Sequence, residues 1–580
     1  MVSALPTLDG DVIDPVAERR DVSDTVIGSL MLAFDGLEVP ADVAERLARA
    51  PAAGVTLFRF SNVADPGQIR SLTAAIQAAA AGGRVATAGG HFAATDRGGA
   101  ARDLPILIAA DQEGGQLIGL GDGTTPFAGN MALGAAGDPE LTERVWRAMG
   151  LELRALGVTV DYGPVCDLAT NPANPAIGIR SFGDDPQAVG ELVAAAVRGL
   201  QSAGVAAALK HFPGLGDVAS DSHHELPLLA ADRGSLESGE LVPFRAGIVA
   251  GARIVMSAHL AVPALTGDPQ LPSTLAPAVM NGLLRGELGF DGVSITDALD
   301  MRALAQGLNQ VLDVLAALRA GVDLLLTAPD PEARARIEAG LRHAAARGLI
   351  DTAAARASAG RVRALRGWLA GFDQPELAVV GGAAHAALAD ELAARALTLV
   401  RDDEGLLPLA LDPTDRIAAI MPTPTDQTPA DTSSTVRAGL AAALRAHHQA
   451  VDEIIVDYAP SADDIAAVRD RVRDHALVVV GTTAATAERG QAALVEALLA
   501  AGPPVLTVAL RTPFDLAAYP ASRVHASSYG LLRPVARGAG RRALWQGSVP
   551  GTSPGGHSGP ASDGPRSRTL TTCSTRMPRR

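Results

Sequence analysis

The fold is decided by the stretch Val205-Ala206-Ala207-Ala208-Leu209-Lys210-His211-Phe212-Pro213-Gly214. It begins as a short apolar run, and two ionisable residues, Lys210 and His211, follow the run directly. An apolar run without polar alternation is typical of a strand that is buried on both faces, as in a parallel sheet covered by helices. We therefore predict that the polar residues after the run lie at the carboxyl end of such a strand.

The same pattern recurs from about residue 50 to residue 350. Helical spacing of apolar residues separates the runs, for example in 141–156 and 189–200. The runs are 55–58, 105–108, 158–160, 205–209, 254–256, 293–295 and 324–326, and the polar residues after them include Arg59, Asp111, Asp167, Lys210, His259 and Asp297. Since catalytic groups of a (β/α)8 barrel lie at the carboxyl ends of its strands, we predict an α/β fold with a TIM-type barrel. An open doubly wound sheet is the alternative, but no G-x-G-x-x-G or P-loop stretch supports it.

The chain divides into five predicted parts. Residues 1–24 form an N-terminal extension, 25–370 the barrel, 371–390 a linker and 391–534 a smaller α/β sandwich domain with apolar runs such as 417–420 and 477–480. Residues 535–580 hold eight arginines and one acidic residue among many glycines, prolines and serines, which is typical of a disordered segment. A reading-frame shift near residue 535 is an alternative, because a further strand and helix are expected there.

Composition argues against several classes of protein. The formal net charge of −15 argues against nucleic-acid binding, and 3% aromatic residues favour a short ligand over a long polysaccharide. The two cysteines, Cys166 and Cys573, do not indicate a disulfide scaffold. No uncharged apolar run is long enough to span a bilayer, and the N-terminus contains no apolar signal region. We therefore expect a cytoplasmic protein without a membrane partner.

One segment concentrates ionisable residues. Lys210 is the only lysine among the 49 Lys and Arg residues. A compact ammonium can direct its charge at a single point, which a planar guanidinium cannot, so Lys210 is a candidate functional residue. It opens the segment 210–227, KHFPGLGDVASDSHHELP, which places three histidines, two aspartates and a glutamate between glycines and prolines. Loops rich in ionisable groups on an apolar scaffold are typical of functional sites.

This loop resembles the signature of β-N-acetylglucosaminidases in glycoside hydrolase family 3. Three further stretches carry the resemblance in matching order and spacing: 111–115 (DQEGG), 180–186 (RSFGDDP) and 296–301 (TDALDM). The resemblance extends over roughly residues 25–370 and, more loosely, 380–534.

The resemblance implies that Asp297 is a nucleophile that forms a glycosyl–enzyme intermediate. Retaining cleavage needs a carboxylate on one side of the anomeric carbon and an acid/base on the other. Asp297 follows the run 293–295, so a strand would hold it. The alternative role for Asp297 is the N-cap of a helix beginning at Ala298. We interpret the neighbouring Asp300 as part of the first turn of that helix.

In the family's subgroup with an Asp-Ser-His loop, the histidine is the acid/base and the aspartate orients it. The resemblance gives these roles to His223 and Asp221. A histidine titrates near neutral pH, and a carboxylate partner stabilises the imidazolium that donates a proton to the leaving group. His224 is the alternative acid/base, but the Asp-x-His spacing favours His223. We interpret His224 and Glu225 as structural loop residues.

By the same resemblance, the residues that bind hydroxyl groups of the terminal sugar are Asp111, Arg180, Lys210 and His211. Arg59 is a further candidate, with a solvent-facing rim arginine as the alternative, and Asp167 either contributes or anchors a barrel loop. The sequence departs from the family at Leu215, where relatives often carry a histidine, and at Gln116 and Gly119, where basic residues are usual. These departures concern the leaving-group side of the site.

We therefore expect an exo-acting, retaining β-N-acetylglucosaminidase that releases terminal non-reducing β-N-acetylglucosamine from muropeptide fragments of the cell wall, in peptidoglycan recycling. Its partner is a small saccharide. We expect no metal or organic cofactor and no nucleic acid, and the sequence makes no prediction of oligomeric state. A phosphorylase with the same residues is the near alternative, because a histidine, unlike a second carboxylate, does not repel phosphate. The Asp-Ser-His loop argues against a β-glucosidase.

Two alternatives belong to other classes of protein. Asp221, His223, His224 and Glu225 are residue types that bind metals, but their spacing matches no helical H-E-x-x-H site. The second alternative is an inactive sugar-binding protein, against which the presence of both the nucleophile and the Asp–His pair argues.

Overall fold

The computed structural model describes residues 15–49, 52–82, 104–436 and 439–531. The predicted tail 535–580 and the first 14 residues of the predicted extension lie outside the described residues. Helix α1 (Pro15–Ile27) begins within the range assigned to the extension, and its Val26 and Ile27 belong to the core of the first domain.

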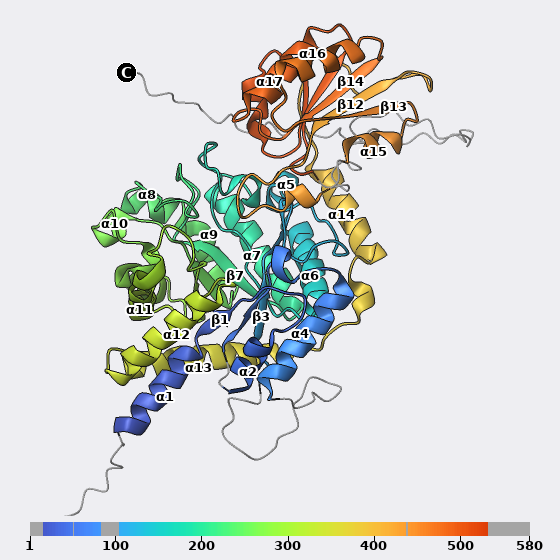
Figure 1. Ribbon diagram of the computed structural model, residues 1–580. Coiled ribbons are helices and arrows are strands. Elements are labelled where there is room, and N and C mark those ends of the chain that lie inside the picture. Colours follow the sequence, from blue (N-terminus) through green and yellow to red (C-terminus); the bar gives the residue numbers. More distant parts are fainter. Residues whose placement is uncertain (1–14, 50–51, 83–103, 437–438, 532–580) are drawn as a thin grey trace, which may run out of the picture. The chain divides into compact units, whose positions relative to one another are not determined.

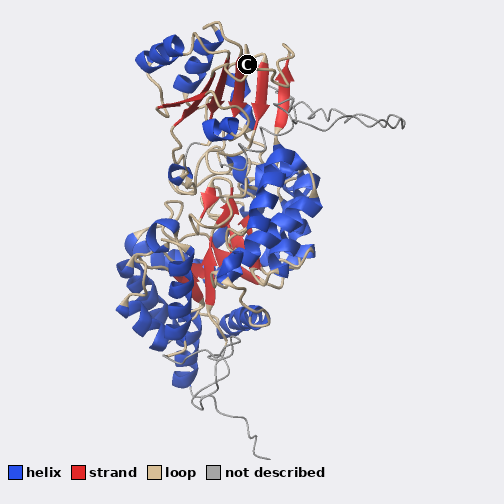
Figure 2. Ribbon diagram, turned by 90° about the vertical axis from the view of Figure 1, so that its right-hand side faces the viewer, coloured by secondary structure: helices blue, strands red, loops and turns tan. Residues whose placement is uncertain are grey.

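Eight parallel strands form the sheet of the first domain, and helices surround them (Figures 1 and 2). The order is β10-β1-β2-β3-β6-β7-β8-β9, and a parallel bridge between Ile295 and Leu324 brings the two ends of the sheet together. The strands are β1 (Leu30–Leu32), β2 (Gly54–Thr56), β3 (Leu107–Ala110), β6 (Val160–Asp161), β7 (Ala206–Phe212), β8 (Ile254–Ser257), β9 (Val293–Thr296) and β10 (Leu325–Leu326). The predicted barrel is confirmed.

An aspartate followed by a proline begins four of the barrel helices. The side chains of Asp65, Asp138, Asp185 and Asp330 accept hydrogen bonds from backbone N–H groups of the first turn, and the proline needs no such partner. The longer helices are α2 (Ala41–Arg49), α4 (Pro66–Ala80), α6 (Pro139–Ala155), α7 (Pro186–Ser202), α9 (Leu241–Val249), α11 (Gln310–Ala320), α12 (Pro331–Ala346), α13 (Thr352–Leu369) and the π-helix η3 (Ala278–Glu287). The predicted helices 141–156 and 189–200 correspond to α6 and α7.

Two apolar clusters divide the barrel into an interior and an outer layer. Side chains that alternate along the strands, such as Leu107, Ala109 and Ile254, Met256, fill the interior. Their neighbours, such as Ile108 and Val255, pack against the surrounding helices. Because both faces of each strand are buried, the sequence shows continuous apolar runs rather than alternation.

A second, six-stranded sheet follows, in the order β11-β16-β15-β14-β12-β13. Only β11 runs antiparallel, against β16. Alternate residues of β12 face two separate apolar clusters, one with α15 (Leu440–Arg445) and one with α16 (Ala462–Arg471) and α17 (Arg489–Leu499). The strands are β11 (Thr398–Asp402), β12 (Ile417–Pro422), β13 (Val451–Val456), β14 (Leu477–Thr482), β15 (Val505–Ala509) and β16 (Val524–Ser527). The predicted α/β sandwich is confirmed.

One described segment, Leu377–Ala396, is long and apolar enough to cross a membrane by length and composition alone. The structure divides it into a 3-10 turn, η5 (Leu377–Val379), and a helix, α14 (Ala383–Ala396), so that α14 begins inside the predicted linker. At 1.5 Å per residue, α14 is about 21 Å long, shorter than the roughly 30 Å of a hydrocarbon core. Its Leu388 and Leu392 pack in the core of the barrel, and its Glu391 pairs with Arg144 of α6. The buried residues of α14 therefore form one face of the helix that packs against the barrel.

Candidate active site

A cavity of about 170 Å³ lies at the carboxyl ends of the barrel strands. It is smaller than the 300–1,000 Å³ pockets that hold drug-sized ligands, which favours a ligand of about one ring. Its lining brings together every residue that the sequence indicated for the site, namely Arg59, Asp111, Arg180, Lys210, His211, Asp221, His223 and Asp297.

Asp297 follows β9 and enters the cavity from a turn. Its backbone N–H donates to the Ser257 carbonyl at 3.1 Å, and its Oδ1 accepts from the Ala298 N–H at 2.8 Å. Burial raises the pKa of Asp297, but electrostatic interaction with His211, His259 and His223, together with the hydrogen bond from the Ala298 N–H, outweighs this and lowers the pKa below its usual value. The carboxylate is therefore ionised at neutral pH, as a nucleophile requires.

The helix that we expected after Asp297 does not exist. Residues 299–306 form turns, and α11 begins only at Gln310. The N-cap role for Asp297 and the helical role for Asp300 were therefore wrong. The backbone is held instead by His259, whose Nε2 lies 3.1 Å from the Ala298 carbonyl and whose Nδ1 lies 2.8 Å from Thr274 Oγ1.

His223 and Asp221 form a hydrogen-bonded pair. His223 Nδ1 lies 2.7 Å from Asp221 Oδ1, and the same oxygen accepts from the His223 backbone N–H at 2.9 Å. Burial lowers the pKa of His223, but the hydrogen bond and charge of Asp221, with the charge of Asp297, raise it above its usual value overall. The pairing at Nδ1 leaves Nε2 to carry the mobile proton. By contrast, His224 and Glu225 are exposed and do not line the cavity.

Lys210 and Arg180 converge on a carboxylate that we had not assigned to the site, Glu113. Arg180 donates from Nε and Nη2 to the two oxygens of Glu113, both at 2.9 Å. Lys210 Nζ lies 2.7 Å from Glu113 Oε1 and donates to Asp111 Oδ1 at 2.6 Å. Burial raises the pKa of Glu113, but the charges of Arg180 and Lys210 lower it to about 2. Glu113 therefore fixes both cations, and Asp111 remains the partly exposed member of the group.

The spacing of Asp111 and Glu113 in the sequence could have indicated Glu113. Asp111 and Glu113 are separated by one residue at the strand β4 (Gln112–Gly114), and such residues lie on the same side of an extended chain. Lys210 and His211 belong to the carboxyl-terminal part of β7 (Ala206–Phe212), as the apolar run before them predicted. Both side chains are therefore held by a strand.

Asp167 anchors the loop and orients His211. Its Oδ2 lies 2.6 Å from His211 Nδ1, and its Oδ1 accepts from the Leu215 N–H at 2.7 Å. Leu215 itself is buried, with 3% of its surface exposed. Arg59 lines the cavity with a side chain that is 13% exposed, and its Nη2 lies 3.5 Å from the exposed Asp122.

The second domain also contributes to the cavity, through Pro429, Ala430 and Thr432. Thr432 accepts from the Ile118 N–H at Oγ1 (3.1 Å) and donates its own N–H to the Gln116 carbonyl (2.8 Å). Gln116 precedes the strand β5 (Leu117–Ile118) and Ile118 belongs to it, so Thr432 is hydrogen-bonded to the β4–β5 pair.

A buried arginine joins the same two segments. Arg511 donates from Nη2 to Gln116 Oε1 at 2.6 Å and from Nη1 to Asp431 Oδ2 at 2.7 Å. A guanidinium from the second domain thus contacts Gln116. Sequence reasoning missed Arg511 because it lies 395 residues away from Gln116 along the chain.

Among the described residues, no group of three or more His, Cys, Asp or Glu side chains is arranged to hold a metal ion. This also holds for the predicted alternative metal site, whose residues were Asp221, His223, His224 and Glu225. Its last two side chains are exposed and do not line the cavity. The site geometry thus rests on hydrogen bonds and ion pairs between protein groups.

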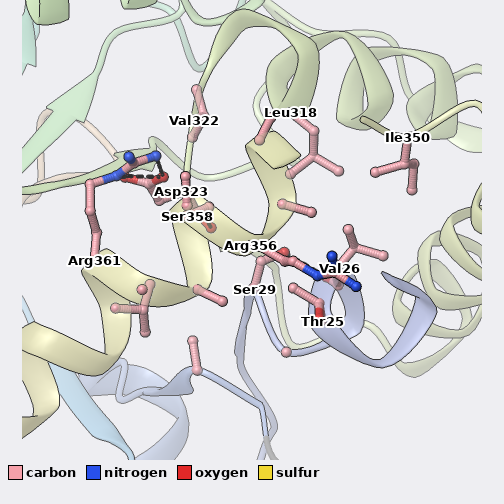
Figure 3. Close-up of a pocket in the computed structure, with 18 of the residues that line it drawn as sticks. Thr25, Val26, Ser29, Leu318, Val322, Asp323, Ile350, Arg356, Ser358 and Arg361 are labelled. Carbon is pink, nitrogen blue, oxygen red and sulfur yellow. Dashed lines mark hydrogen bonds and ion pairs between the residues drawn. The ribbon is translucent and has the colours of Figure 1, made fainter. Parts of the chain in front are cut away.

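A larger cavity, of about 1330 Å³, opens at the opposite end of the barrel (Figure 3). Its wall includes Ser29 and Asp323, which precede β1 and β10, so it lies at the amino ends of the strands. Figure 3 shows Arg361 turned toward Asp323, which it binds at 2.6 Å. Arg285 binds the same carboxylate at 2.7 Å. Because this end of a barrel usually serves stability, we place the chemistry in the smaller cavity.

Residues 27–365 match the Glycosyl hydrolase family 3 N terminal domain. The chain is 35% identical over 409 residues to a beta-hexosaminidase A of Pseudoalteromonas piscicida, which is 66% of this chain and 65% of that relative. It is 37% identical over 303 residues to a beta-hexosaminidase of Stenotrophomonas maltophilia (strain K279a), 51% of this chain and 82% of the relative. Among solved structures, a glycoside hydrolase family 3 beta-N-acetylglucosaminidase from Paenibacillus sp. str. FPU-7 is similar with a TM-score of 0.81 and 33% identity, covering 89% of this chain and 95% of that one.

Proposed function

Because the chain belongs to glycosyl hydrolase family 3, as the loop 210–227 predicted, we propose that it is an exo-acting, retaining β-N-acetylglucosaminidase. The beta-hexosaminidases and the beta-N-acetylglucosaminidase among its relatives support N-acetylglucosamine as the sugar that is released. The small cavity supports exo action, because it accepts one terminal ring rather than the interior of a chain.

The observation that carries the proposal is the Asp221–His223 pair in the same cavity as the ionised Asp297. In the first step, a carboxylate oxygen of Asp297 attacks the anomeric carbon while the bond to the leaving oxygen breaks. His223 donates its Nε2 proton to that oxygen, so the leaving group departs as a neutral alcohol. Asp221 stabilises the imidazolium before this transfer, because its charge faces Nδ1.

In the second step, neutral His223 accepts a proton from water as the water oxygen attacks the same carbon. The bond to Asp297 breaks, the carboxylate is regenerated, and the sugar leaves with the configuration it had in the substrate. The imidazolium is restored for the next turnover.

The remaining polar groups hold the terminal sugar. In the cluster of Asp111, Glu113, Arg180 and Lys210, the carboxylate of Asp111 is the partly exposed hydrogen-bond acceptor. We therefore assign Asp111 to sugar hydroxyls, with Lys210 and Arg180 as donors beside it. His211 is fixed through its Nδ1 by Asp167, and its Nε2 lies 3.5 Å from Arg180 Nη2, so we assign the two side chains to the same end of the sugar. Arg59 also lines the cavity, and we assign it to the same group of sugar-binding side chains.

We further propose that the substrates are muropeptide fragments of the cell wall and that the protein works in the cytoplasm. A short saccharide fits the small cavity and the low content of aromatic residues. Such fragments carry a terminal β-linked N-acetylglucosamine, which is the unit that the proposed reaction releases.

The test is release of aryl alcohol from an aryl β-N-acetylglucosaminide, with and without phosphate. We expect turnover in phosphate-free buffer, with the β-anomer of free N-acetylglucosamine as the first product in NMR. Asp297→Asn should lower kcat by about 10⁴-fold or more, whereas the matched Asp300→Asn should retain most activity. A requirement for phosphate, with sugar-1-phosphate as product, would instead identify a phosphorylase. Binding of N-acetylglucosamine without any turnover would identify a sugar-binding protein.

A further inference from the structure

Phe60 is an exposed aromatic side chain at the mouth of the active site. It lines the cavity, yet 69% of its surface is exposed. Among the described residues, ten large hydrophobic side chains are exposed to solvent, and Phe60 is the one that is aromatic. Aromatic residues make up only 3% of the chain, so a ring at this place is a specific feature of the site.

The turn that carries Phe60 is rigid. Phe60 belongs to the short helix α3 (Arg59–Asn62), directly after β2. Asn62 is fully buried, accepts from the Phe58 N–H at 3.0 Å, and donates to the carbonyls of Phe34 (2.9 Å) and Gly36 (3.0 Å). The ring is therefore presented to solvent from a fixed backbone, which lowers the entropy that is lost when a ligand covers it.

Exposure orders the cavity from its floor to its rim. The side chains of Lys210, Arg180 and His211, which we assign to the terminal sugar, are 2%, 5% and 7% exposed and form the floor, whereas Asp111, assigned to the same sugar, is 27% exposed. The side chain of His223 is 29% exposed. Since His223 must reach the leaving oxygen, the leaving group lies on the rim side of the cavity, where Phe60 is also found.

We propose that Phe60 is the platform for the first ring of the leaving group and that this leaving group is a second sugar. The inference rests on the proposed glycosidase function. One face of a pyranose ring presents C–H groups, and an aromatic face is the surface that such a ring covers best. A short alkyl group lacks the area to cover the ring. Pro429 and Ala430 of the second domain line the same cavity and add apolar surface.

The experiment compares two substrates that share the terminal sugar but differ in the leaving group: N,N′-diacetylchitobiose and methyl β-N-acetylglucosaminide. In Phe60→Ala, the ratio of kcat/KM for the disaccharide to that for the methyl glycoside should fall about 3- to 10-fold. Phe60→Tyr retains the ring and should restore the ratio. Val249→Ala is the matched control, because Val249 is 88% exposed at the end of α9 and does not line the cavity.

The possible failures are distinguishable. If the wild-type protein cleaves both substrates and Phe60→Ala leaves the ratio unchanged, or lowers both values equally, Phe60 is no platform and the inference is wrong. If the wild-type protein cleaves neither substrate, the proposed glycosidase function itself fails. Thermal unfolding of each variant shows whether a loss of activity is a loss of folded protein.

Discussion

Replacing Glu113 by glutamine removes one negative charge from the buried cluster that holds the site together. In the wild-type structure this carboxylate binds Arg180 twice, at 2.9 Å, and Lys210 at 2.7 Å. The three side chains are 1%, 5% and 2% exposed. In Glu113→Gln the two buried cations keep only the weaker support of Asp111 and, for Arg180, of Asp167.

The pKa of Glu113 gives the magnitude of this effect. It falls from 4.5 to about 2, which corresponds to about 3 kcal/mol in favour of the ionised form. Attraction at these distances is about 6 kcal/mol per pair at an effective dielectric constant of 20, and desolvation of several kcal/mol per ion offsets much of it. Breaking a buried pair typically costs about 3–5 kcal/mol. We therefore expect the free energy of unfolding to fall by about 3–5 kcal/mol.

Urea unfolding followed by tryptophan fluorescence measures this loss, because Trp146 is fully buried in the barrel. The control is Glu143→Gln, whose pair with Arg198 is about half exposed and should contribute less than about 1 kcal/mol. The pKa of Glu113 is lowered in the folded state, so its stabilisation is complete above about pH 4.5 and is lost as the pH falls through about 2. If Glu113→Gln and Glu143→Gln unfold at the same urea concentration, the buried-charge argument is refuted.

Three further substitutions test other contacts. Asp221→Asn removes the partner that raises the pKa of His223, so the basic limb of kcat/KM against pH should move to lower pH; an unmoved limb would show that Asp221 does not tune the acid. Lys210→Arg places a larger group where Nζ lies 2.6 Å from Asp111, and kcat/KM should fall by about 100-fold; a change below about threefold would contradict this. Arg511→Met leaves Asp431 buried without its cation and should lower the free energy of unfolding by about 3–5 kcal/mol. The control is Arg523→Met, which should change that free energy by less than about 1 kcal/mol because the Arg523 side chain is 60% exposed. Equal effects of the two substitutions would argue against a structural role for Arg511.

Most strands were predictable because their apolar runs are local features of the chain. Two of the strands that we did not predict, β1 and β16, show the limit of this reasoning. β1 (Leu30–Leu32) has only three residues and lies directly after α1. β16 (Val524–Ser527) includes His525 and Ser527, which are fully buried although they are polar. A hydrogen bond between Thr507 Oγ1 and His525 Nδ1, at 2.8 Å, offsets the cost of burying this imidazole. No local sequence pattern reveals such a partner.

The site residues were predictable where they belong to one contiguous motif. The Asp221–His223 pair follows from two positions in a short loop, and its geometry is a consequence of that spacing. The role of Glu113 depends on Arg180 and Lys210, which are 67 and 97 residues away along the chain. The helix expected after Asp297 was wrong because tertiary contacts, including the one from His259 to the Ala298 carbonyl, hold that backbone in a turn.

The sequence by itself determined the barrel, the sandwich domain and the motifs that identify the family, because hydrophobic period and contiguous motifs are properties of neighbouring residues. Only the tertiary structure decided which charges pair, which aromatic ring lies at the rim, and that Arg511 of the second domain supports Gln116 beside the cavity. These features depend on distances between residues that are hundreds of positions apart. Burial makes such contacts strong, and burial is settled only when the whole chain has folded.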